Sequence, residues 1–250
     1  MFPQKTMATR LLRIFTIGAL AGTVVIPLHP VNSMMLKLAF LACLAALWTG
    51  LTVLGWKRPW WRIAVLILPV IGLMPFVLPG GDIDPDELRN DYVRRMSGFE
   101  GTKYFWGGEN ARGFDCSGLP RRALRDALLA YGIRHGNGEA LRACLEQWWF
   151  DASAKALGEG YRGYTLPIGT TGTIQSMDYA GLLPGDLAVT TNGIHILAYA
   201  GEGRWIQADP GIGAVATRDG RKDDNLWFDM PVTTHRWQLL APQRMSDTAP

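Results

Sequence analysis

The 250-residue chain has few of the residues that build metal centres, disulfide frameworks or nucleic-acid surfaces. It contains three cysteines and four histidines, and its formal net charge is only +3. Three cysteines are too few for a disulfide framework, and no cysteine or histidine pair has the spacing of a zinc site. The basic residues form no long run, and this argues against a nucleic-acid partner. We therefore expect neither a metal nor another cofactor.

Apolar residues are present in quantity, and they concentrate in the first third of the chain. Uncharged apolar stretches cover residues 14–28, 38–56 and 63–79. A membrane-spanning helix needs about 20 mostly apolar residues, which the second and third stretches supply. The first stretch is shorter, and a cleaved signal peptide is an alternative for it. We expect residues 1–81 to be a membrane anchor of two or three transmembrane helices. The alternative is a buried helical hairpin in a soluble protein.

The basic residues of the first third predict how this anchor is oriented. Two groups flank the apolar stretches: Lys5, Arg10, Arg13, Lys57, Arg58 and Arg62. The positive-inside rule places both groups in the cytoplasm. Residues 82–250 then lie on the other side of the lipid bilayer, whether the first stretch is retained or cleaved.

The remainder, residues 82–245, predicts one α+β domain in which helices precede a small antiparallel sheet. A helix should begin at Asp84-Pro85, because aspartate caps helices and proline suits their first turn. Two more helices are predicted over 117–131, with its arginines facing solvent, and 139–157, followed by a loop over 158–172. Turn residues separate five predicted strands, at 187–191, 194–200, 205–209, 214–218 and 235–240.

One cysteine occupies a position suited to nucleophilic chemistry. Gly113-Phe114-Asp115-Cys116-Ser117-Gly118 places Cys116 at the start of a predicted helix, after the glycine-rich turn Tyr104-Phe105-Trp106-Gly107-Gly108. A helix start offers unpaired N–H groups and the positive end of the dipole, which lower a thiol pKa and can hold an oxyanion. We expect the pKa of Cys116 to lie below the free-thiol value of about 8.5. The alternative is an inert packing residue, the interpretation given to Cys43 and Cys144.

A histidine and two polar residues follow on neighbouring strands. His195 lies among apolar residues, and a cysteine followed by a histidine is the minimum set for nucleophilic acyl chemistry. If the strands pair about residue 201, Gln207 lies opposite His195 and can accept its second ring proton. Asp209 shares the face of Gln207 and is the reserve for this orienting role. The alternatives are a satisfied core histidine and an ordinary polar strand residue.

Taken in order, these segments resemble the landmarks of the NlpC family of papain-like cysteine peptidases, which cut the peptide stems of bacterial cell walls. The resemblance covers roughly residues 101–209 and rests on four segments: YFWGG at 104–108, GFDCSG at 113–118, PGDL at 184–187 and HILAYAGEGRWIQA at 195–208. It implies a papain-like core with Cys116 and His195 as the catalytic pair. It also implies that Tyr104, Asp115 and Ser117 hold the free amino end of the substrate.

Three features depart from the family pattern. The family more often has a second histidine at the position of Gln207 and a proline at that of Lys103. The long interval between Cys116 and His195 points to an insertion at 132–172.

Together, the apolar stretches, the strand pairing and the resemblance predict a membrane-anchored cysteine hydrolase of Cys-His-Gln type with no cofactor. Its substrate and partner would be the peptidoglycan stem peptide, cut outside the bacterial cytoplasmic membrane. Two alternatives stay open: an amidase or acyltransferase of the same fold acting on another substrate, and a catalytically inactive, anchored cell-wall binding module.

Overall fold

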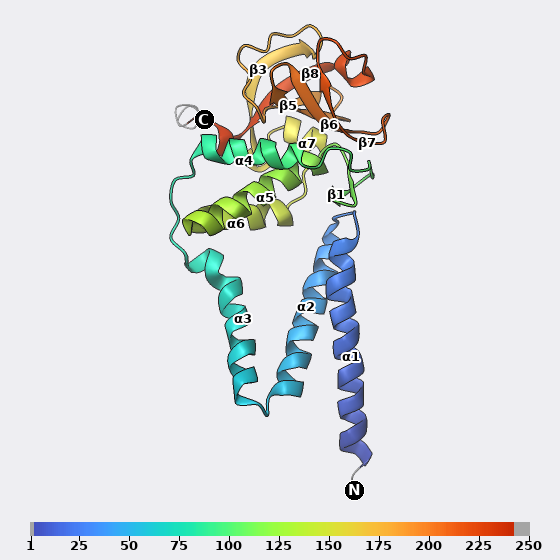
Figure 1. The fold of residues 1–250 in the computed structure, drawn as a ribbon, viewed down its shortest axis with the longest axis vertical. Coiled ribbons are helices and arrows are strands. Elements are labelled where there is room, and N and C mark those ends of the chain that lie inside the picture. The colour runs from blue at the N-terminus through green and yellow to red at the C-terminus, as the bar shows by residue number, and fades with distance from the viewer. Residues whose placement is uncertain (1–2, 243–250) are drawn as a thin grey trace.

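A computed structural model describes residues 3–242, and it confirms the predicted fold class. Three long apolar helices come first, and an α+β domain with helices ahead of an antiparallel sheet follows (Figure 1). We call residues 82–242 the outer domain, because they lie beyond one end of the three apolar helices (Figure 1).

The anchor helices are α1 (Pro3–Leu28), α2 (Met34–Gly55) and α3 (Pro59–Val77). All three are long and apolar enough to cross a membrane, and the qualifying part of α1 runs from Met7 to Leu28. Apolar side chains on the helices face outward; Ile14 and Ile71, for example, are 66% and 59% exposed. In Figure 1, α1 and α2 lie side by side, whereas α3 diverges from α2 on its way to the outer domain. The start of α1 and the α2–α3 turn lie at the end of the anchor that faces away from that domain.

The helices of the outer domain are α4 (Pro85–Ser97), α5 (Gly118–His135), α6 (Gly138–Trp149) and α7 (Ala154–Gly158). As predicted, the Asp84 side chain caps α4 by accepting hydrogen bonds from the N–H groups of Asp86 and Glu87, at 2.9 and 3.2 Å. Helix α5 ends at Gly136, whose φ of 59° lies in the left-handed region that glycine adopts without strain.

Two helix predictions were wrong. The single helix predicted over 139–157 is two helices, because the chain turns extended at Phe150 and Ser153 then caps α7. The arginines of α5 do not all face solvent, since Arg121 and Arg125 are buried against the carboxylate of Glu109.

A six-stranded antiparallel sheet forms the other layer, in the order β3-β8-β4-β5-β6-β7. Its strands are β3 (Thr165–Thr173), β4 (Leu187–Thr190), β5 (Ile196–Gly201), β6 (Arg204–Asp209), β7 (Ala214–Asp219) and β8 (Pro231–Trp237). A separate pair, β1 (Glu109–Asn110) and β2 (Gly113–Phe114), precedes α5. Three short 3₁₀ turns complete the domain: η1 (Tyr161–Gly163), η2 (Leu226–Phe228) and η3 (Gln238–Leu240).

Strand β3 replaces most of the loop predicted over 158–172. Its glycines and Pro167 weaken the strand signal of its threonines, and pairing with β8 forms it, with an irregularity between Pro167 and Thr171. One face of the sheet shares a core with α4 and α5, which includes the fully buried Leu88, Tyr92, Leu124 and Leu187. The apolar side of α4, which includes Leu88 and Tyr92, therefore belongs to the core that α5 shares with the sheet.

Candidate active site

The start of α5 is held by a carboxylate one residue before Cys116. Asp115 Oδ1 accepts hydrogen bonds from the Gly118 N–H at 2.5 Å and from the Ser117 hydroxyl at 3.0 Å. Asp115 and Ser117, both predicted to bind substrate, are therefore bound to each other and shape the helix start. Cys116 lies between them in the sequence, two residues before the first residue of α5.

The glycine-rich turn packs directly on this helix start. The Gly108 carbonyl accepts a hydrogen bond from the Asp115 N–H at 2.9 Å. A β-carbon on Gly118 would clash with that same carbonyl, and one on Gly108 would clash with the Gly113 carbonyl. Two backbones therefore meet where no side chain fits, and this explains the glycines on both sides of Cys116.

The Cys116 thiol is in its neutral form in this arrangement. Burial, followed by the Asp115 carboxylate, raises its pKa to about 12, against a smaller lowering by backbone N–H groups of Ile196, Ser117 and Cys116. The sequence-based expectation of a lowered pKa is therefore wrong: the N–H groups act as expected, but burial outweighs them. Sγ lies 3.9 Å from the Ile194 carbonyl oxygen, so the backbone entering β5 passes beside the thiol.

His195 is buried and one of its ring nitrogens is fixed. Its Nε2 lies 2.6 Å from Gln207 Oε1, and the side chains of both residues are almost inaccessible to solvent. The indole of Trp227 stacks on the imidazole, with ring centroids 3.9 Å apart and 16° between planes. Burial lowers the His195 pKa to about 4, although the Gln207 hydrogen bond and the Asp209 charge both act to raise it.

Gln207 is in turn held by Asp209. Gln207 Nε2 donates to Asp209 Oδ2 at 3.2 Å. The same carboxylate accepts hydrogen bonds from Asn225 Nδ2 at 2.7 Å, Trp227 Nε1 at 3.3 Å and the Gly211 N–H at 2.7 Å. Asp209 therefore does not compete with Gln207 for the histidine. The two act in series, and Asp209 also holds the residue that covers His195.

The predicted contact between His195 and Gln207 exists, but the strand register behind the prediction was wrong. Ala198 pairs with Ile206 and Tyr199 with Trp205, so Gln207 lies across from Leu197. The turn centres on Glu202, with φ of 53°, and the pairing shifts between Tyr199 and Gly201. His195 lies just before β5 and reaches Gln207 diagonally, which long side chains on neighbouring strands can do.

The structure brings Tyr104 to the nucleophile as well. Burial, and then the nearby Cys116 and Asp115, raise the Tyr104 pKa to about 12. Between residues 3 and 242, however, no hydrogen bond joins the Cys116 thiol to the His195 ring, and no cluster of three or more histidine, cysteine or acidic residues could hold a metal. The thiol thus lies beside the carbonyl of Ile194, the residue before His195, and is not hydrogen-bonded to the imidazole.

Two residues of this site were missed by sequence reasoning. Trp227 and Asn225 lie near η2, far along the chain from His195, and no spacing rule connects them to it. The PGDL segment turns out to be structural, because Asp186 forms a buried ion pair with Arg236 at 2.6 Å and accepts from the Leu183 N–H at 2.7 Å.

Comparisons with known proteins place the chain in a family. The model of the NlpC/P60 family matches residues 101–226. Among solved structures, NlpC1 from Trichomonas vaginalis is 20% identical with a TM-score of 0.42, over 62% of this chain and 45% of that one. RipB from Mycobacterium tuberculosis, a peptidoglycan hydrolase, is 21% identical with a TM-score of 0.36, over 60% of this chain and 65% of that one.

The chain spans less than two thirds of the length of either solved protein. A search of curated proteins finds no match. The matched family segment includes Cys116, His195 and Gln207 and makes up half of the chain. The protein belongs to the NlpC/P60 family, whose members are cysteine peptidases or hydrolases.

Proposed function

We propose that this protein is a membrane-anchored cysteine hydrolase that cleaves peptide amide bonds of bacterial cell-wall stem peptides. The observation that carries the proposal is the meeting of the α5 start with the entry to β5. It places the thiol beside the Ile194 carbonyl, next in the chain to a histidine whose Nε2 is fixed by Gln207. Family membership supports the reaction class.

The hydrogen-bond chain behind His195 defines the role of its ring. Asp209 can only accept hydrogen bonds, so the Gln207 amide points its NH₂ group at Asp209 and its oxygen at His195. The imidazole must then carry its proton on Nε2, and Nδ1 keeps a lone pair. A neutral imidazole with a lone pair on Nδ1 is a general base, and the low pKa keeps it neutral at physiological pH.

In the proposed reaction, His195 Nδ1 takes the thiol proton as Sγ attacks the amide carbonyl carbon. The N–H groups of Cys116 and Ser117, which already lower the thiol pKa, hold the oxyanion. The imidazolium then protonates the leaving amine. Water, deprotonated by the same nitrogen, hydrolyses the thioester and restores the thiol. Because the resting thiol is neutral, substrate has to bring Sγ and Nδ1 within hydrogen-bond reach before attack.

Tyr104, Asp115 and Ser117 are proposed to hold the free amino end of the substrate. Both cap hydrogen bonds of Asp115 use Oδ1. The second oxygen of the carboxylate is therefore available to an ammonium group close to Cys116. Ser117 contributes by fixing the carboxylate, and Tyr104 borders the same space.

The anchor is proposed to place the outer domain outside the bacterial cytoplasmic membrane. Arg10 and Arg13 lie toward the start of α1, and Lys57 and Arg58 form the α2–α3 turn, so both groups belong to the end opposite the outer domain (Figure 1). The positive-inside rule assigns that end to the cytoplasm. We propose that residues 1–81 form the membrane anchor and residues 82–245 the peptidase domain. Residues 132–172, which include α6 and α7, are proposed to be an insertion in that domain.

The test is digestion of purified cell wall by the full-length protein in a membrane mimic, with the released fragments identified by mass spectrometry. We expect soluble stem-peptide fragments with a newly exposed terminus, and none from the Cys116→Ala protein. Binding to cell wall without release would instead support a binding module. Release from a different acylated substrate alone would support the amidase or acyltransferase. A reporter enzyme active only in the cytoplasm, fused after residue 250, should be silent.

A further inference from the structure

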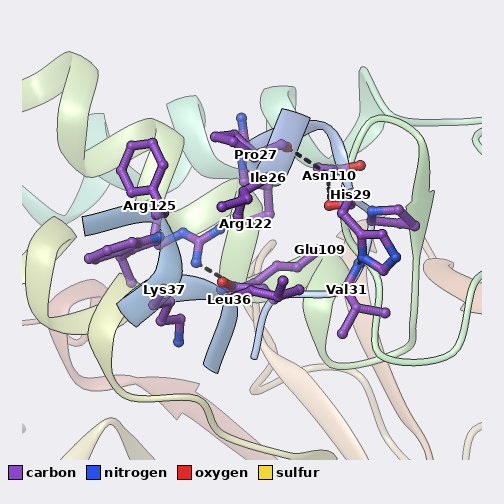
Figure 2. Close-up of a pocket in the computed structure, with 14 residues that line it drawn as sticks. Ile26, Pro27, His29, Val31, Leu36, Lys37, Glu109, Asn110, Arg122 and Arg125 are labelled. Atoms are coloured by element: carbon purple, nitrogen blue, oxygen red, sulfur yellow. Dashed lines mark hydrogen bonds and ion pairs between the residues drawn. The ribbon is translucent and has the colours of Figure 1, made fainter. Parts of the chain in front are cut away.

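The loop between α1 and α2 is paired with the turn that precedes Cys116. Val31 forms an antiparallel bridge with Gly108, and the Glu109 N–H donates to the Pro30 carbonyl at 2.9 Å. Asn110 Nδ2 donates to the His29 carbonyl at 2.7 Å, one of the contacts drawn in Figure 2. The outer end of the anchor therefore contacts the glycine-rich turn itself.

The Glu109 side chain lies at the centre of this junction and is only 2% exposed. Its Oε2 accepts a hydrogen bond from Asn32 of the α1–α2 loop. Its Oε1 lies 2.9 Å from Arg125 Nη1, drawn in Figure 2, and 3.5 Å from Arg121 Nη1; both arginines are on α5. One carboxylate thus joins the anchor to the helix that begins after Cys116.

A second buried charge extends the junction into α2. Lys37 is 2% exposed, and its Nζ binds Asp151 Oδ1 at 2.8 Å and the Trp149 carbonyl at 3.2 Å. The same Asp151 oxygen lies 3.0 Å from Arg121 Nη1. An unbroken chain of ion pairs therefore runs from Lys37 through Asp151 and Arg121 to Glu109.

A plain tether would not need this arrangement. Burying charges costs free energy, and removing one member of a buried pair is strongly destabilising. The second link to the outer domain, through α3, shows a simpler pattern, in which Arg142 donates to the Pro75 carbonyl at 2.8 Å and the Gly138 N–H donates to the Pro79 carbonyl at 2.9 Å. The charge network is confined to the link that reaches the Cys116 turn.

The path from this junction to the nucleophile is short. Gly108, bridged to Val31, supplies the carbonyl that receives the Asp115 N–H. Asp115 caps α5 and immediately precedes Cys116. A displacement of the α1–α2 loop therefore changes the backbone that sets the position of Sγ.

We propose that Glu109 is a positioning residue through which the α1–α2 end of the membrane anchor sets the geometry of the Cys116 turn. For its effect on turnover, the inference rests on the proposed hydrolase function. Its structural part stands apart from that function, since backbone exchange can detect it without any substrate.

The test uses full-length protein in nanodiscs and compares Lys37→Met, Asn32→Ala and Lys37→Arg with the wild type. Lys37→Met keeps the length of the side chain and removes its charge, whereas Lys57→Met makes the same change at the far end of α2 and is the matched control. Hydrogen–deuterium exchange over residues 105–115 is measured beside cell-wall hydrolysis, with kcat and KM determined separately on a soluble stem-peptide substrate.

For Lys37→Met and Asn32→Ala we expect exchange over 105–115 to accelerate and kcat to fall, each by about tenfold, with KM little changed. Exchange in β4 and β5 should stay as in the wild type, and Lys37→Arg should restore most of kcat. Unchanged exchange over 105–115 in both variants would overturn the inference, as would faster exchange with unaltered kcat. If the wild type hydrolyses nothing, the proposed function fails, and the exchange data still decide whether the junction orders the turn.

Discussion

The two halves of the candidate site are held in different ways. The nucleophile half, residues 104–118, is fixed by backbone contacts between glycines and by the Asp115 cap, and it connects through Glu109 to the membrane anchor. The base half is fixed mainly by side-chain hydrogen bonds, in the series His195, Gln207 and Asp209, and lies within the outer domain.

Because of this difference, the two halves of the site are sensitive to different changes. In the nucleophile half, backbone packing leaves no room for side chains at Gly108 and Gly118. Because Gly108 also pairs with the α1–α2 loop, movements of the anchor can displace this half. The base half depends on one buried carboxylate, Asp209, which is 2% exposed. Damage to the first half should change the nucleophile, and damage to the second should change proton transfer.

The largest effect is expected from removing the nucleophile. Cys116→Ala should lower cell-wall hydrolysis by a factor on the order of 10⁴ or more, because no other group in the site can form the thioester. Circular dichroism and the melting temperature should be close to those of the wild type, since the change removes one sulfur atom whose hydrogen bond to the Ile194 carbonyl, at 3.9 Å, is weak. Cys144→Ala, a substitution in α6 away from the site, is the control and should keep normal turnover. Normal turnover by Cys116→Ala would refute the mechanism.

Local signals allowed several features outside the base half to be predicted. The α4 cap at Asp84 and the three apolar helices follow from residues within a few positions of each feature. The burial of Arg121 could not be predicted in this way, because it depends on Glu109 and Asp151, which α5 meets only in the folded chain.

The base half was predicted less completely, for the same reason. His195 and Gln207 were found from a hairpin pattern, and their contact survived an error in register because it is diagonal. Trp227 and Asn225 arrive from a distant segment, and β3 exists only through its pairing with β8. The prediction of a lowered Cys116 pKa was wrong because burial raises this pKa more than the N–H groups of the helix start lower it. Burial depends on the whole fold.

The second prediction concerns the state of the nucleophile at rest. With its pKa raised from 9.0 to about 12, the Cys116 thiol is almost entirely protonated at pH 8. Alkylation of the free enzyme by iodoacetamide at that pH should be about a thousand times slower than for a thiol of pKa 9, because only the thiolate reacts. The rate should rise tenfold per pH unit through pH 11. Rapid alkylation on a plateau below pH 8 would show that the resting site holds an ion pair.

The third prediction concerns Asp209 in the base half. Asp209→Ala leaves five donors without their acceptor: the buried side chain of Gln207, the half-buried side chains of Asn225 and Trp227, and the N–H groups of Gly211 and Ile212. We expect a loss of about 2–4 kcal/mol in the free energy of unfolding of the outer domain, since each unsatisfied buried group costs about 1–3 kcal/mol and partial relaxation offsets some of that cost. Chemical denaturation measures it.

Activity of Asp209→Ala, measured on the folded fraction, should fall further than for Gln207→Ala. This reverses the ranking that follows from pairing the strands about residue 201, because Asp209 holds both Gln207 and the indole that covers His195. Thr217→Ala on the neighbouring strand β7, whose side chain contacts Glu100, is the control and should change neither quantity much. A milder effect at Asp209 than at Gln207 would show that the carboxylate does not hold the base half together.

The smallest effect is expected at Gln207, which orients the ring of His195 and transfers no proton. Gln207→Ala should lower kcat by about tenfold to a hundredfold, the usual cost of losing a supporting partner of a reactive group. The pKa of Cys116 and its alkylation rate should not move, because Gln207 is not among the groups that shift that pKa. Gln207→His should keep substantial activity, since an imidazole nitrogen can accept the Nε2 proton while its other N–H donates to Asp209. Equal losses for alanine and histidine would mean that shape at this position matters more than hydrogen bonding, and the two halves of the site would then differ less than the structure indicates.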